Sequence, residues 1–432
     1  MTHVLFVTPY YPPEKTAPAI RISETAQCLV RRGYEVTVLT TFPNFPTGIV
    51  APEYRGRLIR REEREGVRIV RVWSYITPTK GFLKRILAQL SFGCVAPLLG
   101  WRGVGRPDVA IVESPPLFDA IAGRLLARGK RCPFIFTVAD LWPASAVQLG
   151  VLRNAFFIRL AEWLEWTTYR RAGLVWAVTE DIRKILVKCG MSPQRVMLLT
   201  NGVDTGKFYP PPMAQAREAL VWEKRFTVLY AGTHGLAQGL KTVLDAARQL
   251  RAFQDIHFIF VGDGAEKASL QEKAQHENLT NVTFLDPQAH ERMPLVLAGA
   301  DVCLVPLRDI PLFRGALPSK MYEIMACARP IILAIDGEAR QMLEQEAGAA
   351  VYVEPENAGA LASAVLRLYE HPEVAEALGE RGRTFVEAHF DREKLVEELE
   401  IHITGLLGRD ASHFELAMER TPVVAGVEKS QV

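Results

Sequence analysis

The residues best suited to chemistry lie in one loop-to-helix stretch of the second half of the chain. A turn-forming run from Gly315 to Ser319 precedes Lys320 and Glu323, and Ser319 is placed to cap a helix that extends to about Ala328. The free N–H groups at the start of such a helix attract anions, and Lys320 adds a positive charge beside them. This pattern predicts a phosphate-binding site.

Two purely structural roles compete with a functional role for Glu323. In a capping box the acid stands three residues after the cap, where this sequence has Tyr322. Lys320 and Glu323 could instead form an ordinary surface ion pair at (i, i+3) spacing, worth about a few tenths of a kcal/mol. That second alternative stays open.

Glycine-containing segments that follow predicted strands supply further contacts for an anion. Residues 231–239 and 261–264 let backbone N–H groups approach a ligand, although plain turns between strand and helix would have the same sequence. Residues 286–290 follow a third strand and could meet a nucleobase. The candidate contacts in these segments are Gly232, His234, Gln238, Gly239, Gly262, Asp263, Gly264 and Gln288.

A further candidate, Asp140, stands in the first half of the chain, directly after the predicted strand at 134–138. A carboxylate at the carboxyl end of a parallel strand can bind a sugar hydroxyl or accept a proton. Capping of a helix that begins near Trp142 is the alternative. Residues 113–116 and 14–16 follow other strands on the same side. They are candidates for the site that binds an acceptor molecule, the second substrate of a transfer reaction.

Several kinds of site are excluded by what the sequence lacks. A dinucleotide redox site needs glycines right after the first strand, but no glycine precedes Gly33. A metal-dependent sugar-nucleotide enzyme usually has two aspartates one residue apart. No such Asp-x-Asp pair is present, so we expect a metal-free means of holding a diphosphate. The six cysteines are scattered without a CxxC, which argues against structural zinc and a disulfide framework.

Composition indicates a globular protein of about two domains. The chain has 432 residues, 49% of them hydrophobic and 23% charged. A net charge of +2 gives no indication of a nucleic-acid partner. The first ten residues lack a basic region and resemble a core strand more than a signal peptide, so we expect a cytoplasmic protein.

Short apolar runs alternate with helical patterns along both halves of the chain. This alternation predicts an α/β protein with two doubly wound domains facing across a cleft, joined by a linker at 210–212. The first half has expected strands at 4–8, 35–39, 109–112, 134–138, 175–178 and 196–199, with a helix at about 19–32. The second half has expected strands at 227–231, 257–261, 282–284, 302–305, 331–333 and 350–353, and residues past about Leu407 are predicted to form a frayed tail.

Residues 81–106 interrupt this alternation with an uncharged, mostly apolar stretch that has basic flanks. Gln89, Gly93 and Pro97 make it too short and too interrupted for a membrane-spanning helix, which needs about 20 apolar residues. A helix lying on a membrane surface, with Trp101 at the interface, and a buried domain helix are equally good interpretations.

Taken together and in this order, these segments resemble the retaining, nucleotide-sugar-dependent glycosyltransferases of family 4, which have the GT-B fold. The resemblance covers almost the whole chain. Two of its stretches, at 42–48 and 317–320, resemble the branch that includes L-fucosamine transferases of bacterial surface polysaccharides. The motifs are Pro-Pro-Glu-x4-Ala-x-Arg at 12–21, Arg-Gly-Tyr-Glu-Val-Thr-Val at 32–38, Phe-Pro-Asn-Phe-Pro-Thr-Gly at 42–48, Asp-Leu-Trp-Pro at 140–143, Asn-Gly-Val-Asp at 201–204, Val-Gly-Asp-Gly at 261–264 and Leu-Pro-Ser-Lys-Met-Tyr-Glu at 317–323.

The resemblance implies a role for each matched residue of the opening stretch. Glu323 would hold the ribose of the nucleotide, and the backbone amides of Ala316, Leu317 and Ser319 would contact the diphosphate. Lys320 would then be a charge partner of that diphosphate.

The sequence departs from the family pattern at three places. The first acid of the family's Glu-x7-Glu pair would stand at Gly315. No arginine or lysine occurs at 233–238, where relatives carry diphosphate-binding cations, so His234, Lys320 or Arg314 would have to replace them. A His or Arg often precedes the acid at 140, whereas here it is Ala139.

The resemblance therefore implies a retaining transfer of a sugar from a nucleotide-diphosphate sugar to a lipid-linked or polysaccharide acceptor, with no other cofactor. The expected parts are an acceptor domain at 1–205, a donor domain at 206–390, a helix at 391–408 that returns to the first domain, and a flexible tail at 409–432. The expected location is the cytoplasm, with the inner membrane surface as a further possibility. The alternatives are a GT-B sugar-nucleotide epimerase and a non-catalytic subunit that binds nucleotide sugar.

Overall fold

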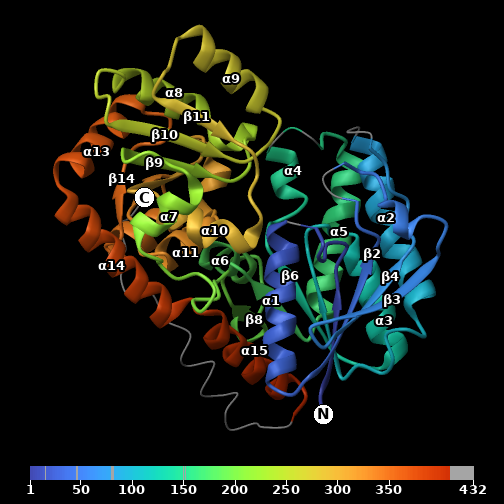
Figure 1. The fold of residues 1–432 in the computed structure, drawn as a ribbon. Helices are drawn as coiled ribbons and strands as arrows, with labels where there is room; N and C mark the ends of the chain where they lie inside the picture. The colour runs from blue at the N-terminus through green and yellow to red at the C-terminus, as the bar shows by residue number, and fades with distance from the viewer. Residues whose placement is uncertain (15, 45–46, 79–81, 149, 151, 409–432) are drawn as a thin grey trace. The chain divides into compact units, whose positions relative to one another are not determined.

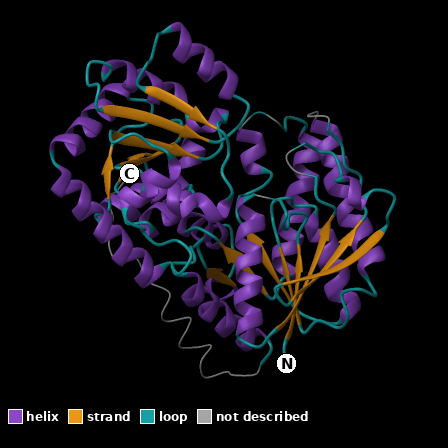
Figure 2. Ribbon diagram, in the orientation of Figure 1, coloured by secondary structure: helices purple, strands orange, loops and turns teal. Residues whose placement is uncertain are grey.

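The computed structural model of the protein describes residues 1–14, 16–44, 47–78, 82–148, 150 and 152–408 (Figure 1). Contacts within the chain divide it into two units. One comprises Met1–Thr200 and the chain from Leu395 onward, and the other comprises Asn201–Lys394. Each unit is built around its own mainly parallel β-sheet with helices on its faces (Figure 2). The predicted tail at 409–432 lies outside the described residues.

The sheet of the first unit has eight strands in the order β3-β4-β2-β1-β5-β6-β7-β8. All neighbours pair in parallel except β3, which runs antiparallel to β4. The order reverses at β1, which pairs with β2 on one side and β5 on the other. Such a reversal is the usual place for a ligand in an open parallel sheet. The strands are β1 (His3–Val7), β2 (Glu35–Thr41), β3 (Ile59–Arg64), β4 (Val67–Val72), β5 (Val109–Val112), β6 (Phe134–Val138), β7 (Leu174–Ala177) and β8 (Val196–Leu198).

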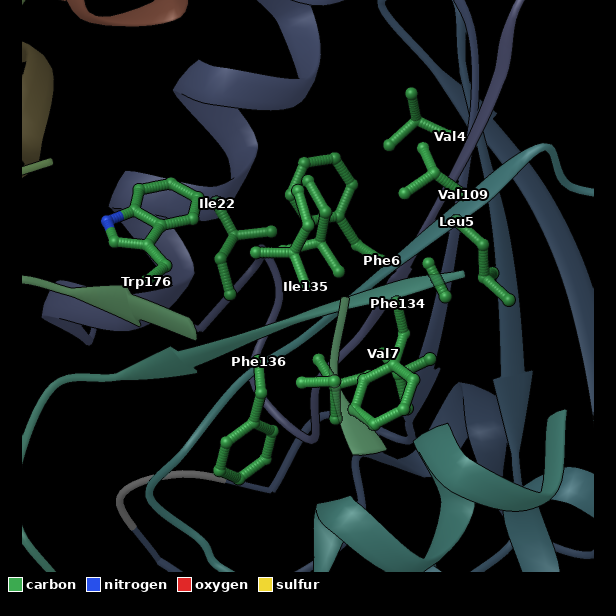
Figure 3. Packing of buried hydrophobic residues seen from close by; sticks show 14 of the residues in the cluster. Val4, Leu5, Phe6, Val7, Ile22, Val109, Phe134, Ile135, Phe136 and Trp176 are labelled. Carbon is green, nitrogen blue, oxygen red and sulfur yellow. The ribbon is translucent and has the colours of Figure 1, made fainter. Parts of the chain in front are cut away.

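Buried apolar side chains on both faces of this sheet form the core of the first unit. Val4 and Phe6 of β1 point to the side on which Ile22 packs, whereas Leu5 and Val7 point to the opposite side (Figure 3). Burial on both faces explains why the strands read as continuous apolar runs. The helices are α1 (Ala17–Arg31), α2 (Phe82–Gly100), α3 (Asp119–Lys130), α4 (Ala144–Gln148), α5 (Ala155–Arg171) and α6 (Glu180–Lys188), with short helices η1 (Pro52–Tyr54) and η2 (Pro193–Arg195).

The antiparallel pair β3–β4 was not expected from the sequence, because β3 is an edge strand whose residues are mostly charged and exposed. Its position is set by Arg71, a β4 residue that is only 2% exposed. The Arg71 guanidinium donates to Glu62 of β3 at 2.9 Å and to the carbonyl of Thr41 at 3.3 Å. It also donates to the carbonyl of Pro12, in the loop after β1. Arg71 thus ties the edge of the sheet to the loop that follows its central strand.

The sheet of the second unit has six strands, all parallel, in the order β11-β10-β9-β12-β13-β14. The strands are β9 (Phe226–Ala231), β10 (Ile256–Val261), β11 (Val282–Leu285), β12 (Val302–Pro306), β13 (Ile331–Ala334) and β14 (Ala350–Tyr352). The α-helices are α7 (Met213–Leu220), α8 (Leu240–Gln249), α9 (Lys267–His276), α10 (Met293–Ala298), α11 (Lys320–Ala326), α12 (Glu338–Arg340), α13 (Ala358–Glu370) and α14 (Pro372–His389). The short helices are η3 (Leu236–Gln238), η4 (His290–Arg292) and η5 (Pro311–Gly315), and η6 (Gln341–Glu346) is a π-helix. The order reverses at β9, between β10 and β12, so the loop after β9 occupies the place where ligands bind in such sheets.

The last described helix, α15 (Arg392–Leu406), begins in the second unit and continues into the first. Its Leu395, Val396, Leu399 and Ile403 are buried in the core of the first unit.

Helix α2 accounts for most of the apolar segment at 81–106. One face packs inward, because Phe92 and Ala96 are buried and Gly93 lies against the backbone of Phe118. Leu87 and Leu98 are instead exposed to solvent. The helix is therefore part of the domain and also presents an apolar outer surface. Among the described residues, no helix combines the length and the hydrophobicity needed to cross a membrane.

We predict that Arg71→Met lowers the free energy of unfolding of the first unit by about 3 kcal/mol, because it leaves Glu62 and two carbonyls without their buried donor. Arg68→Met, in the same strand, should cost less than about 1 kcal/mol, because its partner Glu35 is largely solvated. Six of the seven tryptophans belong to the first unit. Urea unfolding followed by tryptophan fluorescence therefore reports on it, and equal costs for the two variants would contradict this role of Arg71.

Candidate functional site

The loops that follow β9 and β10 are packed together so closely that only glycine fits at two positions. The amide of Gly232 donates to the carbonyl of Val261 at 2.9 Å. A Cβ at Gly262 would overlap the carbonyl of Gly232, and one at Gly264 would overlap the backbone of His234. These glycines also have positive φ angles. These glycines therefore allow the loops after β9 and β10 to come into contact.

Lys320 points into this junction from the start of α11. Its Nζ lies 4.1 Å from the centre of the Tyr230 ring, a cation–π contact. A Cβ added to Gly232 would come within 2.7 Å of the same Nζ, so the ammonium group lies directly against the glycine backbone. Burial lowers the pKa of Lys320 to about 8, and the nearby Glu323 carboxylate opposes that shift. Near neutral pH the lysine is still mostly protonated, and its charge is poorly solvated.

The loop before α11 adds backbone donors next to Lys320. Among the described residues, the amides of Leu317, Ser319 and Lys320 have no protein acceptor. The amide of Ala316 donates to the carbonyl of Phe313 at 3.1 Å, so this amide is already bonded within the loop, and its contact with a diphosphate stays a prediction. Three free N–H groups and one ammonium therefore remain for an anion.

Helix α11 differs from its prediction at both ends. Ser319 occupies the cap position, but its backbone is helical and its side chain makes no capping hydrogen bond. The helix ends at Ala326 rather than near Ala328, because Ala328 has a φ of 50° and breaks the helical geometry. Only two turns of helix support the site, so the local N–H groups matter more than a long helix dipole.

Glu323 lies one turn into α11 and is partly exposed. It shares with Lys320 and Cys303 the wall of a cavity of about 20 Å³, which is room for about one water molecule. Its carboxylate influences the pKa of Lys320, so the two groups act within one electrostatic environment.

His234 is not a source of charge at this site. Its side chain is fully buried beside the rings of Tyr230, Phe260 and Phe284. Burial is the main cause that lowers its pKa to about 4, so the ring is neutral near pH 7. Of the three residues considered as replacements for the missing loop cations, His234 is therefore neutral, and Lys320 is the one whose charge contacts the β9 loop.

Other predicted contacts support the loops rather than face Lys320. The side-chain carbonyl of Gln238 accepts from the amide of Gly235 at 3.2 Å. Asp263 is exposed, and its carboxylate accepts from the amide of Gly264 at 2.8 Å. Gly239 allows a left-handed turn before α8, with a φ of 60°.

Gln288 belongs to a different surface of the second unit. With Val261 and Leu285 it lines a groove of about 550 Å³ along the face of β9, β10 and β11. Gly315 ends η5, and the adjacent Arg314 is exposed while its backbone packs against Gly337.

In the first unit, Asp140 lies directly after β6 and is engaged locally. Its carboxylate accepts from the hydroxyl of Ser145, in the first turn of α4, at 2.7 Å. Burial raises the pKa of Asp140 despite this hydrogen bond. This hydrogen bond comes from a side-chain hydroxyl of a helix that begins at Ala144, so it is a contact with the helix but not the capping considered for a helix that begins near Trp142.

The predicted acceptor residues of the first unit are also used structurally. Glu113 is buried and forms an ion pair with Arg21 of α1. Thr16 caps α1 by accepting from Ala19 at 3.3 Å, and Glu14 accepts from the amide of Asn44 at 2.9 Å. Lys15 lies outside the described residues.

Two features of the structure were missed from the sequence. Tyr230 holds the ammonium of Lys320 against its ring, and its hydroxyl donates to the carbonyl of Thr233 at 2.7 Å. Asp119 is fully buried near Glu113, and burial raises its pKa well above the usual range. An aromatic residue in a strand and an acid at a helix start gave no distinguishing pattern. No group of three or more possible metal ligands occurs in the described part of the chain.

Two family models match the chain, one for each unit. Residues 16–202 match the glycosyl transferase 4-like domain, and residues 213–385 match glycosyl transferases group 1. The chain belongs to the family 4 type of GT-B glycosyltransferases. It is therefore a glycosyltransferase, and its two parallel-sheet units are the two halves of the GT-B fold.

Relatives and solved structures agree with this membership. The colanic acid biosynthesis glycosyl transferase WcaI of Escherichia coli K12 is 28% identical in an alignment 418 residues long that covers 91% of this chain and 98% of WcaI. The glycosyltransferase WbjE of Pseudomonas aeruginosa is 25% identical over 54% of this chain and 58% of its own. Sucrose-phosphate synthase of Thermosynechococcus elongatus has a similar fold, with a TM-score of 0.74 at 20% identity, covering 95% of this chain and all of that one. Anabaena HepE, solved with UDP-glucose, has a TM-score of 0.69 at 15% identity, covering 94% of this chain and all of its own.

We predict that the lowered pKa of Lys320 makes stability depend on pH. Between the folded pKa of about 8 and the unfolded pKa of about 10.4, the unfolded state binds more protons, so raising the pH stabilises the glycosyltransferase. Relative to Lys320→Met, the wild type should gain about 1 kcal/mol from pH 7.5 to pH 10, a value discounted because the lysine is partly solvated. Thermal unfolding of both proteins across this range tests it, and a constant difference would show that Lys320 has an ordinary pKa.

Proposed function

We propose that this glycosyltransferase moves a sugar, with retention of configuration, from a nucleotide-diphosphate sugar to a hydroxyl of a lipid-linked or polysaccharide acceptor. The names of its relatives support a role in bacterial surface polysaccharide synthesis, because WcaI is named for colanic acid biosynthesis and the structural neighbour WaaG for lipopolysaccharide biosynthesis. HepE was solved with UDP-glucose, which supports a nucleotide-sugar donor. On this proposal the enzyme works in the cytoplasm, at or near the inner face of the membrane.

The proposal rests on one observation, the ammonium of Lys320 held against Gly232 beside the free amides of Leu317 and Ser319. A diphosphate leaving group develops negative charge as the bond to the sugar breaks. Donors that are fixed and poorly solvated stabilise such charge without having to reorganise, which is the largest source of catalysis in many enzymes. Lys320 and the loop amides are donors of this kind.

The other residues would bind rather than react. We propose that Glu323 accepts hydrogen bonds from the ribose hydroxyls of the donor. We also propose that Asp140 binds a sugar hydroxyl. The departing phosphate would take the proton of the acceptor hydroxyl as the new bond forms on the same face of the sugar, so no separate protein base is needed. The charge of Lys320 would serve in place of a metal ion.

We predict that Lys320→Ala and Glu323→Ala each lower kcat/KM for transfer by about a hundredfold or more, as expected for lost contacts with a transition state. The fold should persist in both, as judged by circular dichroism. Lys241→Ala and Glu376→Ala remove the same charges from exposed helix positions and should leave transfer unchanged. Near-normal turnover in both site variants would refute the assignment.

A donor panel separates this proposal from its alternatives. Release of nucleoside diphosphate that depends on added membrane extract, and persists in the presence of EDTA, is expected of the transferase. Conversion of the nucleotide sugar without any acceptor would indicate an epimerase. Thermal stabilisation by a donor without any release would indicate a binding subunit, since a ligand at 100 times its dissociation constant stabilises by about 2.7 kcal/mol.

A further inference from the structure

Helices α2, α3 and α5 of the first unit enclose an apolar groove of about 460 Å³ that takes no part in the site described above. Its walls come from all three helices. Leu90 of α2, Ile121 and Leu125 of α3, and Phe157, Leu160 and Trp163 of α5 all line it. The helices contribute almost only hydrocarbon and aromatic surface, so the groove has few groups that could orient a polar ligand.

The apolar surface continues out of the groove onto the exposed face of α5. Phe156 is 70% exposed and Trp163 is 60% exposed, and Phe157 and Leu160 are about half exposed. Their spacing places all four on one side of the helix. Leu125 of α3 and Leu87 of α2 are also more than half exposed. A monomeric protein rarely leaves so many large apolar side chains together in water unless they contact something.

Positive charge accompanies this apolar surface. Arg124, Arg128 and Arg171 line the groove, and no acidic side chain does so among the described residues. Arg124 is fixed there, because it donates to the hydroxyls of Thr167 and Thr168 at 3.0 and 3.5 Å. Arg128 and Arg171 are exposed and form no hydrogen bond or ion pair through their side chains with the part of the chain that the structure describes, so their charge faces outward.

We infer that this face docks on a lipid bilayer that contains anionic phospholipid, with one hydrocarbon chain in the groove and its phosphate at the arginines. Aromatic and aliphatic side chains flanked by arginines are the combination that favours the boundary between headgroups and acyl chains. A second copy of the chain is a poorer occupant, because a two-fold contact through this face would gather Arg128 and Arg171 of both copies into one apolar interface with no acid among the described groove residues to pair with them. This inference rests on the membrane location in the proposed function and identifies the face of the protein that would contact the membrane.

Vesicle co-sedimentation without donor or acceptor tests the docking face independently of the transfer reaction. Wild-type protein should bind vesicles of phosphatidylcholine with phosphatidylglycerol, and bind phosphatidylcholine alone more weakly. Phe157→Glu combined with Trp163→Glu should weaken binding by about tenfold or more. Leu58→Glu with Ile185→Glu is the matched control, since it adds the same charge at exposed apolar positions of the same unit and should bind as the wild type does.

A second pair of variants tests the charge. Arg128→Gln with Arg171→Gln should weaken binding to the anionic vesicles by about thirtyfold, given about 1 kcal/mol for each of the two basic side chains at such a surface, and should leave binding to phosphatidylcholine unchanged. No binding by the wild type, or equal binding by the Phe157/Trp163 variant and its control, would overturn the inference. So would sedimentation velocity that shows self-association abolished by that same variant. Loss of transfer activity alone would bear on the proposed function and not on the docking face.

Discussion

The close approach of Lys320 to Gly232 is the constraint on which the proposed donor site depends. The ammonium group can lie over Tyr230 only because the residue after β9 has no side chain. That residue is in turn held by its bond to Val261 and by the absence of a side chain at Gly262. A side chain at Gly232 would displace the ammonium of Lys320, and a side chain at Gly262 would separate the ends of β9 and β10.

The same packing gives a physical basis for the proposed role of Lys320 in binding a diphosphate. Water around an exposed lysine would weaken its field, but Lys320 is partly buried and its pKa falls to about 8. A bound anion would restore the charge balance that burial removes. The lowered pKa of Lys320 and the proposed affinity for an anion thus have the same physical origin.

The two units use their strand ends differently. In the second unit, the loop before α11 leaves three amides with no acceptor among the described residues, and the ammonium of Lys320 contacts the face of the Tyr230 ring within the field of Glu323. In the first unit the acids at the strand ends are already engaged, Glu113 by Arg21 and Asp140 by Ser145. The first unit instead exposes large apolar side chains to solvent, several of them on the outer face of α5. A polar donor would bind the polar groups of the second unit, and a lipid surface would cover the apolar face of the first unit.

The sequence by itself determined most of the strands, the pattern of two domains, and the choice of Lys320 and Glu323 as candidates, because each depends on local residue order. Buried parallel strands are continuous apolar runs, and β5 and β6 begin and end where the sequence indicated. Edge strand β3 was missed because its charged residues depend on Arg71 of β4 for their place. Tertiary structure alone decided that His234 is buried and neutral, that the amide of Ala316 is already bonded, and that Tyr230 supports the lysine. These outcomes depend on which loops pack together in space, and no spacing along the chain specifies that.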